Sequence, residues 1–312
     1  MIASTADNAG ALRIYGNLSL LEMAPVLLAA DRIYSGKTVI KHGGVMSLWG
    51  KATDLPSLAA SGQSDIAANT ETQALRGTLE NPDLRFIFTV AECPYRIVCR
   101  RSAGIARLAD LRGKRIGTMP KSSAAFFLDR MLNTVGLTEQ DATLVPFMAK
   151  TRAPLSLMPQ ALRDGDLDAV AVWEPQIQKA KLAIGPDAIE FCDPSVYCER
   201  FNLCTTEAKL NDPATRKRIV AFVRALIVAT DRLQSQPQEG WALVARAAEL
   251  DIATVKDSWP YLKYPGTLAA DLPEVLVLAD AWVAKETRRA PRTQSEMLQF
   301  VDSSVVREAL AS

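Results

Sequence analysis

One sequence pattern occurs twice in this chain, at positions 56–71 and 159–174. Both copies read P-x5-G-x2-D-x5-E, and a short apolar run follows the aspartate in each copy. This order predicts a helix, a glycine turn and a buried strand. A unit that recurs 103 residues later, from Pro56 to Pro159, predicts two similar α/β lobes. Clefts between domains are common binding sites for small ligands.

Strand and helix patterns alternate through most of the chain. Strands are expected at 13–16, 38–41, 66–68, 85–91, 96–100, 115–118, 143–147, 169–172, 188–192 and 200–205. Helices are expected among them at 20–34, 55–61, 124–135, 159–163 and 175–182. After Asp212 the pattern is helical, over 219–233, 241–249, 252–259, 272–286 and 294–301. The alternation predicts an α/β fold with helices on both faces of the sheet.

Composition excludes several classes of protein. The 312 residues are 48% hydrophobic and 23% charged, which is ordinary for a folded protein of two modest domains. The net charge of +1 gives no overall field that favours nucleic acid or an anionic membrane. The basic residues between Arg100 and Arg115 are interpreted as a solvated surface. No run of eighteen apolar residues occurs, so no membrane span is expected.

The N-terminus, residues 1–10, is small and polar and lacks the charged and apolar regions of a signal peptide. Two readings stay open: the protein is cytoplasmic, or a leader has been replaced by an initiator methionine.

Five cysteines and one histidine limit the chemistry of the chain. The cysteine spacings do not match a zinc signature, so no metal site is expected. His42 is the one histidine available as base to a serine or cysteine nucleophile. Cys99 and Cys204 are expected to be free buried thiols, whereas Cys192 and Cys198 are the pair expected to form a disulfide in an oxidising compartment.

Three segments resemble a known protein family: LADLRGKRIG at 108–117, NTVGLTEQDATL at 133–144 and LDAVAVWEP at 167–175. They are similar to segments of periplasmic substrate-binding proteins of ABC transporters, in the nitrate/sulfonate/taurine group that also includes pyrimidine-precursor binders. The likeness is most specific between about residues 100 and 204.

The resemblance implies a type II periplasmic-binding-protein fold, in which two α/β lobes are joined by a two-crossing hinge and followed by a helical C-terminal extension. Lobe I would comprise residues 1–98 and return over 205–312, and lobe II would comprise residues 99–204. The crossings would lie near Cys99 and Cys204.

The best candidates for ligand contact are Ser122 and Ser123, at a predicted helix N-terminus. Unpaired backbone N–H groups and hydroxyls there suit an anion, although plain N-capping is the alternative. In the family, the corresponding loop meets the anionic group of the ligand.

Other candidates follow strand ends, where ligands lodge in open α/β sheets. Each also has a structural interpretation: helix capping for Asn17 and Ser19, a turn for Gly44, packing for Trp49, and a solvated side chain for Arg152. For Asn69, Thr70 and Trp173, ligand contact and a structural role are equally expected. For Glu174, a structural hydrogen bond is favoured. Tyr95 would donate its hydroxyl into the cleft. The complete candidate set is Asn17, Ser19, Gly44, Trp49, Asn69, Thr70, Tyr95, Ser122, Ser123, Arg152, Trp173 and Glu174.

The resemblance implies a solute-binding protein of an ABC importer, periplasmic and monomeric. It would capture a small anionic or zwitterionic organic ligand by hinge closure and deliver it to the transporter permease, with no cofactor, metal or nucleic-acid partner. The alternative is an enzyme on the same fold, of sulfinate-cleaving or pyrimidine-precursor type, that uses His42 or Cys93. A ligand-sensing regulator would need a DNA-binding domain, for which no room precedes the strand at Arg13.

Overall fold

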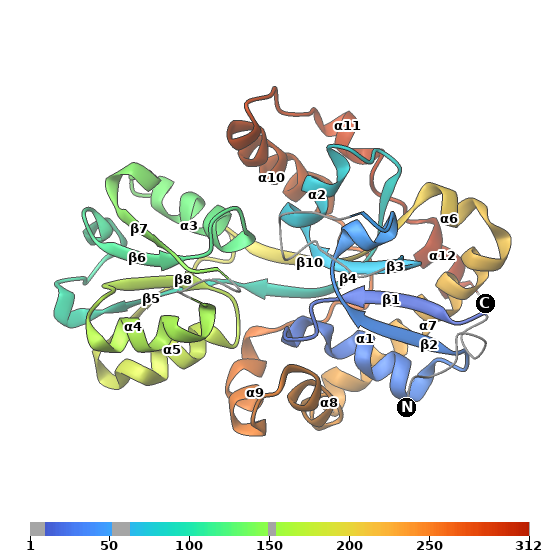
Figure 1. The fold of residues 1–312 in the computed structure, drawn as a ribbon, viewed down its shortest axis with the longest axis horizontal. Helices are drawn as coiled ribbons and strands as arrows, with labels where there is room; N and C mark the ends of the chain where they lie inside the picture. Colours follow the sequence, from blue (N-terminus) through green and yellow to red (C-terminus); the bar gives the residue numbers. More distant parts are fainter. Residues whose placement is uncertain (1–9, 52–62, 149–153, 312) are drawn as a thin grey trace. The chain divides into compact units, whose positions relative to one another are not determined.

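The computed structural model describes residues 10–51, 63–148 and 154–311. The chain forms two compact units (Figure 1). Unit 1 comprises Met1–Glu92, Arg200–Ile252 and Lys263–Ser312, and unit 2 comprises Cys93–Glu199 and Ala253–Leu262. The lobe boundaries expected from the sequence stay a prediction.

Unit 1 contains a five-stranded sheet in the order β2-β1-β3-β10-β4. Its strands are β1 (Leu12–Gly16), β2 (Thr38–His42), β3 (Ile66–Thr70), β4 (Leu84–Pro94) and β10 (Cys198–Thr206). Its helices are α1 (Ala24–Leu28), α2 (Glu71–Thr78), α6 (Glu207–Asn211), α7 (Pro213–Ser235), α8 (Gln238–Ala248), α10 (Leu272–Thr287), α11 (Gln294–Leu298) and α12 (Ser304–Leu310). Figure 1 shows α1 and α7 on one side of this sheet and α2 and α10 on the other.

Unit 2 contains a second five-stranded sheet, in the order β7-β6-β8-β5-β9. Its strands are β5 (Arg96–Arg100), β6 (Arg115–Thr118), β7 (Thr143–Pro146), β8 (Ala169–Val172) and β9 (Ala188–Phe191). Helix α3 (Ser123–Asn133) covers one face, and α4 (Met158–Asp164) and α5 (Gln176–Ile184) cover the other (Figure 1). Most of α9 (Ile252–Ser258) also belongs to unit 2.

The two sheets have equivalent topology. Strand β1 is parallel to β2 and β3, and β6 is parallel to β7 and β8. An antiparallel strand follows in each sheet, β10 beside β3 and β5 beside β8. The second copy of the repeated motif forms α4, a left-handed turn at Gly165 (φ 84°) and β8, as predicted. In the first copy, β3 is confirmed, whereas the expected helix at 55–61 lies outside the described residues.

Alternate side chains of β6 face the two helical layers of unit 2. A Cβ added to Gly117 would meet Leu167, Phe147 and Val170, so this position faces the core shared with α4 and α5. Because successive side chains alternate across a strand, Ile116 and Thr118 face the α3 side. Within the described residues, no helix is long and apolar enough to cross a membrane.

Several helices differ from the sequence predictions. The segment 20–34 is helical but divided: a 3₁₀ turn, helix α1 and a π-helical turn, in which the Tyr34 N–H bonds the Ala29 carbonyl at 2.8 Å. Helix α11 ends at Leu298, earlier than predicted, because Phe300 and Asp302 make backbone hydrogen bonds with Phe86 of β4. Helices α2, α6 and α12 were not predicted.

Candidate functional site

The aspartate of the repeated motif makes the same contacts in both units. In unit 1, the Asp65 carboxylate accepts from the Arg13 backbone N–H at 2.8 Å and also pairs with the Arg13 guanidinium. In unit 2, the Asp168 carboxylate accepts from the Arg115 backbone N–H at 2.9 Å and pairs with that guanidinium. Burial alone would raise the pKa of Asp168, but the bonds from Arg115 outweigh it and hold the pKa below its ordinary value. These aspartates therefore tie the start of the third strand to the first in each sheet.

The motif glutamates also bond equivalent strands, through different donors. Glu71 accepts from the backbone N–H of Arg200 in β10 at 3.0 Å. Glu174 accepts from the Arg96 guanidinium of β5 at 2.5 Å. Both arginines lie on the antiparallel strand beside the motif strand. The motif as a whole is a structural device that places the loops after β3 and β8.

Candidate side chains of unit 1 gather after β1, β2 and β3. The side-chain amide oxygen of Asn69 accepts from the Val45 backbone N–H at 2.6 Å, which ties the end of β3 to the turn that follows β2. Thr70 caps α2 through the Gln73 N–H at 3.4 Å. The Asn17 side chain accepts from the backbone N–H of Ser19 at 3.1 Å.

The remaining unit 1 candidates are Gly44, which is the N-cap residue of a 3₁₀ turn, and Trp49. The Trp49 indole donates to Asp83 at 3.0 Å. As ligand contacts, all the unit 1 candidates stay predictions.

In unit 2, Tyr95 joins the candidate Ser123 to Glu199 in one hydrogen-bond network. Its hydroxyl donates to the Glu199 carboxylate at 2.7 Å and lies 3.0 Å from the Ser123 hydroxyl. The Tyr95 ring packs edge-on against Phe127 and Tyr197, with centroids 5.7 and 5.4 Å away. Sequence reasoning missed Tyr197, which directly precedes β10, and Glu199, the second residue of β10, because no motif marks the start of that strand.

The N-terminus of α3 lies next to this network, because Ser123 is its first residue. The Ser122 hydroxyl accepts from the Ala124 N–H at 3.2 Å and donates to the Met119 carbonyl at 2.6 Å, so Ser122 is the cap. Thr118, the last residue of β6, is 1% exposed and faces the α3 side. Its hydroxyl has no hydrogen-bond partner among the described residues. Thr118 was not among the residues predicted from the sequence.

The candidates after β8 have structural contacts. Trp173 is half-buried and packs against the core cluster of unit 2. Glu174 is buried, which raises its pKa above the ordinary value, although Arg96 opposes this shift by stabilising the carboxylate. Arg152 lies outside the described residues. Ligand contact by these three residues stays a prediction.

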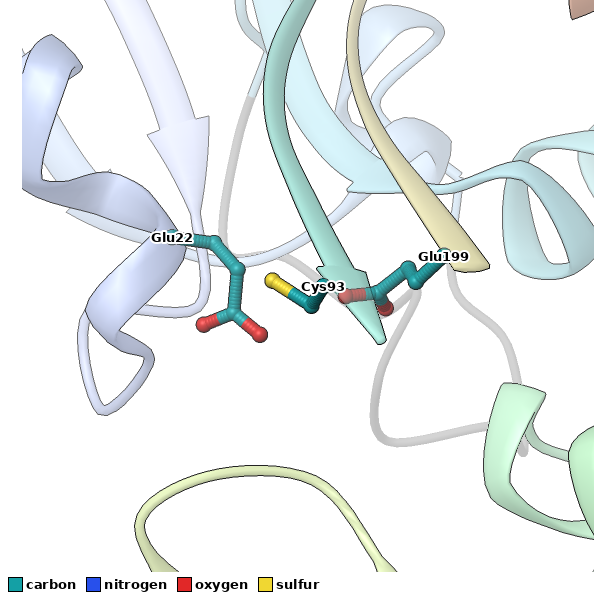
Figure 2. A group of neighbouring side chains, drawn as sticks. All are labelled: Glu22, Cys93 and Glu199. Carbon is teal, nitrogen blue, oxygen red and sulfur yellow. The ribbon is translucent and has the colours of Figure 1, made fainter. Parts of the chain in front are cut away.

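Figure 2 labels Glu22, Cys93 and Glu199, three buried residues that each have one potential metal-ligand atom. Cys93 and Glu199 belong to unit 2, at the end of β4 and the start of β10, and their ligand atoms lie within 4.8 Å of each other. Structural zinc sites use four ligands. The thiol and carboxylate of unit 2 alone do not make such a site.

All five cysteines lie in the described residues, and none of them forms a disulfide there. Cys99 and Cys204 are fully buried, as expected, and burial raises the pKa of both thiols well above the ordinary range. Cys192 is exposed and Cys198 is half-buried, without the disulfide expected for an oxidising compartment. In the basic stretch, Arg101, Arg107, Arg112 and Arg115 are exposed, as a solvated surface requires, whereas Arg100 and Lys114 are half-buried.

Residues 49–240, more than half of the chain, match the NMT1/THI5-like family. The chain belongs to this family. A Haemophilus influenzae protein named "Putative thiamine biosynthesis protein" is 27% identical over 215 residues. That match covers 66% of each chain, just under two thirds of the relative's length.

Two solved structures share the fold at low sequence identity. The periplasmic aliphatic sulphonate binding protein SsuA from Escherichia coli superposes with a TM-score of 0.70 at 17% identity, covering 89% of this chain and 88% of that one. The periplasmic nitrate-binding protein NrtA from Synechocystis PCC 6803 gives 0.72 at 11% identity, covering 97% and 88%. The periplasmic-binding-protein fold expected from the sequence is confirmed.

Proposed function

We propose that this protein is the solute-binding component of an ABC importer, and that it captures a small anionic or zwitterionic organic molecule. Two proteins of the same fold are named for binding aliphatic sulphonate and nitrate. The proposed ligand edge of unit 2 comprises Tyr95, Thr118, Ser122 and Ser123, and the partner is a transporter permease. We place the protein in the periplasm as a monomer.

The Thr118 hydroxyl carries this proposal. A buried hydroxyl without a partner costs free energy unless a ligand or water bonds it. Thr118 lies at the carboxyl end of a parallel strand, on the side where an eleven-residue helix begins. Strand ends of this kind are where α/β sheets bind ligands, and helix N-termini favour anions. The anionic end of the ligand is therefore placed against Thr118 and α3.

The Tyr95 network favours a zwitterion over a simple anion. Tyr95 has one hydroxyl proton, which it donates to Glu199. Ser123 then donates to the Tyr95 oxygen, so the remaining lone pairs of Ser123 accept from a ligand donor. An ammonium group is such a donor, and Glu199 supplies a negative charge in the same network.

Isothermal titration tests the proposal with matched probes: taurine, ethanesulfonate without the ammonium group, nitrate and benzoate. We expect taurine to bind at least about tenfold more tightly than ethanesulfonate. Thr118→Val should weaken both sulfonates about tenfold, or about 1.4 kcal/mol, through loss of one hydrogen bond to a charged group. Thr134→Val is the control, because its hydroxyl bonds the Met131 carbonyl at the far end of α3. Absence of binding by all four probes would contradict the importer function for these ligand classes.

The family and the Haemophilus relative favour a second candidate, the handling of a thiamine precursor. An enzyme of that kind would use His42, which is exposed at the end of β2, or the buried Cys93. Incubation with the hydroxymethyl aminopyrimidine portion of thiamine, followed by mass spectrometry, separates binding from turnover. Product that disappears in His42→Ala or Cys93→Ser would establish the enzyme, whereas unchanged pyrimidine that stays with the protein through gel filtration would support binding alone.

A further inference from the structure

The segment Ala253–Leu262 lies in unit 2, although the chain on both sides of it lies in unit 1. The chain is fastened in unit 1 directly after this segment. Lys263 exchanges two backbone hydrogen bonds with Glu92 of β4, at 2.8 and 2.9 Å. The Tyr264 hydroxyl donates to the Leu21 carbonyl at 3.2 Å. The segment is thus a short loop with a fixed end, not a free tail.

Tyr261 brings this segment onto a buried arginine of unit 2. The guanidinium carbon of Arg96 lies 3.5 Å from the centre of the Tyr261 ring. The Arg96 side chain is only 3% exposed. A cation on an aromatic face is held most strongly when it is shielded from water. Tyr261 therefore covers one face of the Arg96 guanidinium.

Arg96 in turn bonds polar side chains that follow β8 and one side chain of β9. Its guanidinium nitrogens lie 2.5 Å from a carboxylate oxygen of Glu174 and 2.5 Å from one of Glu190. It also donates to the Gln178 side chain at 3.1 Å. The segment therefore reaches the Arg96–Glu174 pair through the contact of Tyr261 with Arg96.

This pair fixes the loop that holds a candidate ligand residue. Glu174 directly follows Trp173, so the direction of the Glu174 side chain constrains the backbone that carries the indole. The equivalent arginine of unit 1, Arg200, is held in a similar way by Asp271, at 2.5 Å. The C-terminal part of the chain thus contacts the motif-linked arginine in each unit.

We propose that Tyr261 is a positioning residue, which holds Arg96 and Glu174 and thereby sets Trp173 at the ligand edge of unit 2. The role of Trp173 toward ligand rests on the proposed function, whereas the positioning itself does not. Fluorine NMR of the full chain labelled with 5-fluorotryptophan reads that positioning without any ligand. Five tryptophans give five signals, and Trp173→Phe identifies the one from Trp173.

We expect Tyr261→Ala to shift or broaden the Trp173 signal and to speed amide hydrogen exchange over residues 172–178 at least about fivefold. Tyr261→Phe keeps the ring and should leave both readouts as in the parent. Tyr34→Ala is the matched control, since Tyr34 is also half-buried but packs on Phe222 in unit 1. It should lower the melting temperature without moving the Trp173 signal.

An unchanged Trp173 signal and unchanged exchange in folded Tyr261→Ala would overturn the proposal. Equal disturbance by Tyr261→Phe and Tyr261→Ala would also overturn it, because the aromatic face would then not be the cause. Taurine titration of the same variants is a separate arm: weaker binding in Tyr261→Ala alone extends the positioning to the ligand. Failure of taurine to bind the parent counts against the proposed function and leaves the fluorine result standing.

Discussion

At the scale of single residues, the repeated motif shows how a short pattern encodes a distant contact. Asp65 and Asp168 were recognised from their spacing, but their partners, Arg13 and Arg115, lie 52 and 53 residues earlier in the chain. Nothing local marks those arginines. The contact exists because the third strand pairs in parallel with the first, which brings both residues to the same sheet edge.

Asp280 of α10 gives a prediction about pH. Its fully buried carboxylate accepts hydrogen bonds from Arg289 and Arg292, at distances down to 2.5 and 2.6 Å. Burial alone would raise the pKa of Asp280, but these bonds outweigh it and hold the pKa below its ordinary value. The stabilisation is therefore complete above the unfolded-state pKa of about 4 and is lost as the pH falls through the lower folded-state pKa.

We expect Asp280→Asn to lower the free energy of unfolding by about 3 kcal/mol at pH 7, as for a buried pair that loses one partner. The difference from the parent should shrink below about pH 4, where the unfolded carboxyl is protonated. Urea unfolding between pH 3 and 7 measures it. Asp231→Asn, at an exposed position of α7, is the control and should change little. A deficit that is constant across this pH range would argue against the charge as its cause.

The sequence predicted the residue types of the candidate site better than their partners. Ser122, Ser123 and Tyr95 were recognised, and two of them, Ser123 and Tyr95, share a hydrogen bond. Thr118 was missed, because its significance depends on the absence of a partner for a buried hydroxyl among the described residues. Tyr261 could not be predicted either, since its partner Arg96 lies far away in the sequence.

At the scale of elements, β6 is sensitive to side-chain volume on one face. A Cβ on Gly117 would lie 2.7 Å from Leu167 Cδ1 and 3.3 Å from Phe147 Cε2. Gly117→Ala should therefore cost about 1–3 kcal/mol of unfolding free energy through overpacking. Leu167→Ala removes the nearest atom, so the double variant should lose less than the sum of the single losses. Additive losses in urea unfolding would show that the Leu167 contact is not responsible.

Strands and long helices were predictable, whereas short helices were not. Strand β8 is a buried apolar run, β1 is buried except at Arg13, and α7 has a clear start in Asp212 and Pro213. Helix α2 begins directly at the end of β3, where Thr70 changes from strand residue to cap. Because Thr70 both ends β3 and caps α2, the sequence contains no turn residues that would mark where the helix begins.

At the scale of the whole molecule, the two units differ in how the chain completes them. All five strands of unit 2 and its helices α3, α4 and α5 lie within residues 93–199. We expect a fragment of these residues to unfold cooperatively in urea, with faster hydrogen exchange after β8 because it lacks Tyr261. Residues 10–92 alone should remain unfolded, since β10 separates β3 from β4 in the sheet. A cooperative transition in the second fragment, or none in the first, would contradict this difference.

The late position of β10 also affects synthesis on the ribosome. Strand β4 leaves the exit tunnel long before β10, its neighbour in the sheet, has been translated. Until then the apolar strand segments of unit 1 are unfolded and exposed, and they can pair with other chains. Residues 93–199 can fold in the meantime, so the first-made part of the protein is the last to become protected, and this interval is when a chaperone is needed.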